Sequence, residues 1–112
     1  MHSDPEQNAL RDILRQIDLA QKFAQGQDRD AFSADIMRVY AVTRCLEIIS
    51  EASRPPLQGA QGTTPGIAWR EMAGAGNVYR HDYQDVAPPR VWDTVQFALP
   101  ALRAAIEQEL GL

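Results

Sequence analysis

Residues 4–26, "DPEQNALRDILRQIDLAQKFAQG", decide the fold class that this chain can adopt. Their apolar side chains recur every three or four residues, which is the spacing of a helix with one buried face. Asp4 can cap this helix, Pro5 suits its first turn and Gly26 can end it. We predict an amphipathic helix whose apolar stripe is made of Leu10, Ile13, Leu14, Ile17, Ala20 and Ala24.

The following stretch, residues 28–53, predicts a short turn and then a long helix with two apolar faces. Asp28 or Asp30 can start the turn, which carries Phe32. A helix that is apolar on two sides must have neighbours packed against both of them. We therefore expect this helix to be central in the domain and the domain to form a homodimer. One face consists of Ile36, Val39, Thr43, Leu46 and Ile49, and the other of Val42, Cys45 and Ile48.

Four charged residues interrupt the apolar surface of this second helix: Arg38, Arg44, Glu47 and Glu51. Arg44 and Glu47 are three residues apart and can pair across one turn, whereas Glu47 and Glu51 repel each other mildly. We interpret the four residues as a solvated face of the helix.

The C-terminal half contains a loop and two further predicted helices. Residues 54–66 are rich in Pro, Gly, Gln and Thr, which is typical of a loop. Residues 67–83 predict a helix weakened by two glycines, and a last helix opens on a proline pair. Pro100 lies inside this last helix and is expected to bend it. The apolar stripe of the last helix is Val91, Val95, Ala98, Leu99, Leu102, Ala105 and Ile106.

These segments together predict an all-α fold, namely a bundle of four principal helices with short loops. The length of 112 residues suits one compact core, so residues 1–112 are expected to form a single domain. Strand signals are weak, because no stretch alternates apolar and polar residues and no Asn-Gly turn occurs.

The charge and the residue composition of the chain limit the classes of function that it can have. The net charge of −4 excludes a constitutive non-specific nucleic-acid binder, so any RNA contact must come from a local patch. Cys45 is the only cysteine and His2 lies at the N-terminus, so we expect no disulfide, no metal site and no cofactor. No apolar run is long enough to span a membrane and no secretory signal is visible, so we expect a cytoplasmic protein.

The stretch "NVYRHDY", residues 77–83, holds the densest group of chemically useful side chains. His81 can act as a general acid or base, and Asn77 shares its helix face because the two are four residues apart. Tyr83 points away from His81 on an ideal helix, so both can serve one site only if the helix ends or distorts nearby. The alternative for each residue is structural: a lone histidine, an ion-paired Arg80 or a half-buried tyrosine ring.

The chain resembles the HepT-like members of the HEPN superfamily over nearly its whole length. The specific part is "IAWREMAGAGNVYRHDYQDV" followed by "VWDTVQFALPALRAAIEQEL", and "AVTRCLEIISEA" is similar to the central helix of the family. This resemblance implies an all-α, up-and-down bundle of four to five helices. The same resemblance implies a small homodimer that acts as a metal-independent endoribonuclease toxin. It also implies that a minimal nucleotidyltransferase antitoxin silences the toxin by attaching adenylate to a signature tyrosine.

The family signature is an arginine, four to six other residues, a histidine, one further residue and a tyrosine. Carried over by position, the histidine is His81, the tyrosine is Tyr83 and the asparagine that follows the arginine is Asn77. The arginine position corresponds to Gly76, so the signature arginine is missing. Arg80 stands directly before the histidine and is the candidate to replace it.

The missing arginine leaves alternatives open. Cleavage of RNA without metal needs an acid, a base and positive charge on the phosphate, and the loss of one such donor costs about 100- to 1,000-fold in rate. The leading hypothesis is a ribonuclease with an altered motif that acts on RNA. A second hypothesis is an impaired HEPN dimer that binds a nucleotidyltransferase, RNA or a nucleotide. A third is a helical interaction module outside the family.

Overall fold

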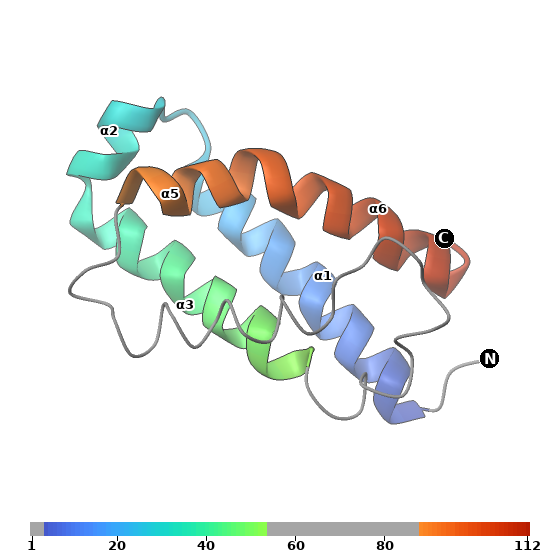
Figure 1. Ribbon diagram of the computed structural model, residues 1–112. Coiled ribbons are helices and arrows are strands. Elements are labelled where there is room, and N and C mark those ends of the chain that lie inside the picture. The colour runs from blue at the N-terminus through green and yellow to red at the C-terminus, as the bar shows by residue number, and fades with distance from the viewer. Residues whose placement is uncertain (1–3, 54–87) are drawn as a thin grey trace.

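The computed structural model describes residues 4–53 and 88–112, and every described element is a helix (Figure 1). In chain order these are α1 (Asp4–Ala24), α2 (Arg29–Ala34), α3 (Ile36–Ala52), α5 (Pro88–Asp93), the π-helical turn η2 (Thr94–Ala98) and α6 (Leu99–Leu110). The all-α class is therefore confirmed for these residues. The loop and the helix predicted between residues 54 and 83 lie outside the described part of the chain.

Helix α1 lies between α3 and α6 in the described bundle (Figure 1). Its buried residues are those of the predicted stripe with Ala9 added, except that Leu14 is only partly buried. The helix stops where the sequence predicts, because Gly26 adopts a φ of 77°. Glycine takes this left-handed conformation without a Cβ clash. Helix α3, the helix predicted to be central, is contacted by α1, α2 and α5, and residues of both of its predicted faces, such as Val39 and Val42, are buried.

The short turn predicted after α1 is the six-residue helix α2. Asp28, one of its two predicted starting points, caps it by accepting a hydrogen bond of 2.7 Å from the backbone N–H of Ala31. The buried side chain of Phe32, which has no exposed surface, stabilises this short helix in addition to its cap. Phe32 therefore anchors α2 to the core.

Arg38 fastens the start of α3 to the end of α1. Its Nε donates a hydrogen bond of 3.0 Å to Asp35, which caps α3. One of its terminal nitrogens donates a bond of 2.7 Å to the backbone carbonyl of Phe23. That carbonyl belongs to the last turn of α1, where the backbone carbonyls have no N–H partner within the helix. Arg38 is therefore only partly solvated on the face predicted to be solvated, since it also joins two helices.

We expect Arg38→Ala to lower the free energy of unfolding by about 1–2 kcal/mol, because two hydrogen bonds of a partly buried charged group are lost. Arg44→Ala is the matched control, since Arg44 has a 3.1 Å pair with Glu47 on the exposed surface and reaches no other helix. Its expected cost is below about 0.5 kcal/mol. Urea unfolding of both variants checks this, and equal costs would contradict the bridging role.

The last helix begins at Pro88, as predicted, and changes its hydrogen bonding before Pro100. The backbone N–H of Leu99 donates to the carbonyl of Thr94, five residues earlier, which makes this turn π-helical. Proline has no N–H and its ring crowds the carbonyl four residues before it. The wider π turn accommodates these constraints, so the bend expected at Pro100 takes this form.

The core is built from one face of each long helix. Two residues that were predicted to belong to these apolar faces are exposed instead, so the prediction is wrong for them. Val91, Val95, Leu99, Leu102 and Ile106 of the last helix are buried as expected. Ile36 is 55% exposed although it lies in the first turn of α3, where Val39 is buried. Ala98 is exposed as well, since it faces outward from the π turn.

Candidate functional site

The residues predicted to carry chemistry, Asn77, Arg80, His81 and Tyr83, lie outside the described residues, as does Gly76. Their prediction therefore stays a prediction. The described residues contain neither of the two histidines of the chain. No group of three or more potential metal-binding side chains occurs among them either. What the structure does describe is the surface where the chain returns from this motif, at the start of α5.

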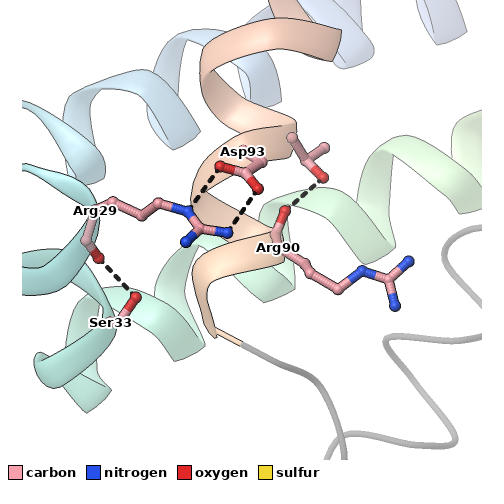
Figure 2. A network of polar contacts seen from close by, with 5 residues as sticks. Arg29, Ser33, Arg90 and Asp93 are labelled. Atoms are coloured by element: carbon pink, nitrogen blue, oxygen red, sulfur yellow. Dashed lines mark hydrogen bonds and ion pairs between the residues drawn. The ribbon is translucent and has the colours of Figure 1, made fainter.

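An ion pair joins α2 to α5 at this surface (Figure 2). The Nε of Arg29 donates to one carboxylate oxygen of Asp93 at 3.1 Å, and a terminal nitrogen donates to the other oxygen at 3.0 Å. This two-pronged geometry is the strong form of an arginine–carboxylate contact. The hydrogen bond and the charge of Asp93 raise the pKa of the Arg29 guanidinium. Both oxygens of Asp93 are thereby occupied.

Two hydroxyl groups support the backbone beside this ion pair. The Oγ of Ser33 donates a hydrogen bond of 2.6 Å to the carbonyl of Arg29, one turn before it in α2. The Oγ1 of Thr94 donates a bond of 3.0 Å to the carbonyl of Arg90 in α5. The guanidinium of Arg90 is exposed and points away from the Arg29–Asp93 pair (Figure 2).

Trp92, the tryptophan of the last helix, packs partly against the core. Its ring meets Phe97 edge to face, with centroids 6.4 Å apart, and Phe97 itself is 71% exposed. The indole N–H is buried and has no hydrogen-bond acceptor among the described residues. A buried donor without a partner costs about 1–3 kcal/mol. This part of the last helix therefore carries both an exposed ring and an unsatisfied donor.

Cys45 is no candidate nucleophile, because it is 3% exposed and burial raises the pKa of its thiol. A raised pKa favours the protonated thiol in the folded state. Folding stability from this group is therefore complete below the ordinary thiol pKa of about 8.5 and is lost as pH rises through the folded pKa.

We accordingly expect wild-type protein to lose more stability between pH 7 and pH 10 than Cys45→Ala. Urea unfolding of both proteins at the two pH values measures the difference. Equal losses would show that the thiol is not held protonated by burial.

No described helix has the length and apolar composition needed to cross a membrane. Small all-helical proteins of this kind serve many unrelated functions, so the fold alone does not select one. The family model "Ribonuclease HepT-like" matches residues 13–109. The chain belongs to the HepT-like ribonuclease family of the HEPN superfamily.

Curated relatives agree with this family. The chain is 34% identical over 99 residues to "Probable ribonuclease HepT" of Thermococcus cleftensis, with 88% of this chain and 90% of the relative covered. It is 33% identical over 98 residues to "Putative RNase MJ1380" of Methanocaldococcus jannaschii, with the same coverage of 88% and 90%. No solved structure matches the chain significantly.

Sequence reasoning missed the Arg29–Asp93 pair. The two residues are 64 positions apart, and no periodicity or motif connects them. Only the packing of α2 against α5 brings them together. By contrast, the Arg44–Glu47 pair was predictable because both partners lie on one helix turn, and it is confirmed at 3.1 Å.

Proposed function

We propose that this protein is a metal-independent endoribonuclease of the HepT-like type, with an altered signature motif. The observation that carries the proposal is the family match over residues 13–109, which includes His81 and Tyr83 in the signature spacing. The names of the relatives describe them as ribonucleases. RNA is therefore the proposed substrate.

In the proposed mechanism, His81 transfers the proton between the 2′-hydroxyl and the leaving 5′ oxygen. This role suits a side chain that titrates near neutral pH. Asn77 orients the phosphate through its amide, and Arg80 supplies the positive charge that Gly76 cannot. Arginine suits this task because its planar fork matches two phosphate oxygens.

The test uses purified protein and RNA in the presence of EDTA. Cleavage that persists with EDTA and is lost in Arg80→Ala supports the proposal and the role of Arg80. An inactive wild type that becomes active as Gly76→Arg would contradict it. That result would favour the second candidate, a HEPN protein that has lost cleavage and keeps binding. The observation behind the second candidate is the glycine at position 76 itself.

A homodimer is part of the proposal. Ile36, Met37 and Tyr40 are 55%, 80% and 60% exposed on the first two turns of α3. Large apolar side chains grouped in this way are typical of a protein interface. Sedimentation of wild type and Tyr40→Glu tests this: we expect a dimer for the wild type, whereas a wild-type monomer would contradict the proposal.

The biological partner in the proposal is a minimal nucleotidyltransferase that acts as antitoxin in the cytoplasm. It would silence the protein by attaching adenylate to Tyr83, as the family resemblance implies. Co-expression of the two proteins followed by mass spectrometry tests this. The expected result is the mass of one adenylate on wild type and none on Tyr83→Phe.

A further inference from the structure

Arg90 lies on the first turn of α5 and is the described arginine that comes nearest in sequence to the signature motif. Six residues separate it from Tyr83. An extended chain advances at most about 3.6 Å per residue, so the seven steps between them span no more than about 25 Å. A single RNA strand that is bound at Tyr83 therefore lies no more than about 25 Å from Arg90.

The charge of Arg90 is not neutralised by the carboxylate one helical turn away. Arg38, Arg44 and Arg103 each pair with an acidic residue three or four positions from them on the same helix. Asp93 stands three positions after Arg90, yet both of its oxygens are held by Arg29 (Figure 2). Among the described residues Arg90 has no ion-pair partner.

An exposed guanidinium without a carboxylate partner is suited to an anion. Arginine binds phosphate with two parallel hydrogen bonds, and phosphate contacts supply most of the affinity of proteins for RNA. The chain as a whole is acidic, so a few arginines must provide these contacts. Resting on the ribonuclease function proposed above, we propose that Arg90 binds a backbone phosphate of the RNA and that Arg29 keeps it available by occupying Asp93.

The proposal makes Arg29 a positioning residue. In Arg29→Ala the carboxylate of Asp93 becomes free to turn along α5 and compete with RNA for Arg90, as Glu47 and Glu107 pair with arginines on their own helices. RNA binding then falls although Arg90 is still present. Removing the freed carboxylate as well, in Arg29→Ala/Asp93→Ala, releases Arg90 and restores binding. A purely structural role of Arg29 would not give this rescue.

The experiment measures the affinity of full-length protein for a fluorescent RNA oligonucleotide whose 2′-O-methyl groups prevent cleavage, over a range of salt concentrations. Loss of one phosphate contact on a single strand reduces the slope of log affinity against log salt by about 0.7, or about fivefold in affinity at 0.1 M salt. We expect this change for Arg90→Ala, a smaller loss of about twofold in affinity for Arg29→Ala because an exposed pair on one helix turn is weak, little change for Arg90→Lys, and recovery in the double variant.

Arg15→Ala is the matched control. Arg15 is also an exposed arginine without an ion pair among the described residues, but it lies on α1. Asp12, one turn before it, likewise has no ion pair among these residues. The slope of Arg15→Ala is expected to equal that of the wild type. Equal slopes for Arg90→Ala and Arg15→Ala, or no RNA binding by wild type, would overturn the assignment of Arg90.

Cleavage of unmodified RNA is measured separately. A wild type that binds with the Arg90-dependent slope but never cuts would refute the ribonuclease function and leave the phosphate contact standing. A wild type that cuts, with a slope that Arg90→Ala does not alter, would refute the phosphate contact alone.

Discussion

Replacing His81 with alanine is expected to lower the rate of RNA cleavage by about 100- to 10,000-fold, the contribution of a positioned general acid or base. The expectation rests on the family match and on the absence of any other histidine from the signature motif. Steady-state cleavage of a labelled RNA in the presence of EDTA measures the effect.

His2→Ala is the matched control, since His2 is the second histidine of the chain and stands far from the motif in sequence. It is expected to cleave at the wild-type rate. Circular dichroism should show that both variants keep their helices. A His81→Ala protein that retains more than about a tenth of the activity would contradict a role of His81 in proton transfer.

Ile17→Ala is expected to cost about 2–5 kcal/mol of folding stability, a large share of the total for a domain of this size. Ile17 has no exposed surface and lies on α1, the helix that packs against both α3 and α6. Removing its side chain leaves a cavity that rigid neighbours cannot fill. Urea unfolding followed by circular dichroism measures the cost.

Ile36→Ala makes the same chemical change at an exposed position and serves as the control. Because Ile36 is 55% exposed, its replacement is expected to change the stability of the monomer by less than about 0.5 kcal/mol. A similar loss in both variants would mean that Ile36 is covered in solution, which the proposed dimer would explain and a dilution series would reveal.

The helices were predictable wherever local rules decide them. The apolar stripe of α1, its stop at Gly26 and the Asp28 cap of α2 each depend on residues within a few positions of one another. The errors arose where packing decides. Periodicity places Ile36 in the apolar stripe of its helix, but it cannot tell whether another element covers that position in the folded bundle.

In the candidate site, too, local features could be predicted from the sequence whereas contacts between distant segments could not. Spacing within one segment relates His81 to Tyr83 and shows that an arginine is missing at Gly76. Contacts between segments, such as Arg29 with Asp93 or Arg103 with Asp18, connect residues 64 and 85 positions apart. Long-range pairs of this kind follow from the packing of α2 on α5 and of α1 on α6, which a single sequence does not contain.

The position of α1 between an early and a late helix also has a consequence for biosynthesis. Chains emerge from the ribosome N-terminus first, at about 5–20 residues per second. Helices α1, α2 and α3 are complete by residue 52, whereas α6 ends at residue 110. During the seconds between, the α1 surface that later contacts α6 has no partner among the described residues already synthesised, and Arg29 and Asp18 have yet to meet theirs. Nascent chains halted before residue 88 should therefore be the form of this protein that recruits chaperones.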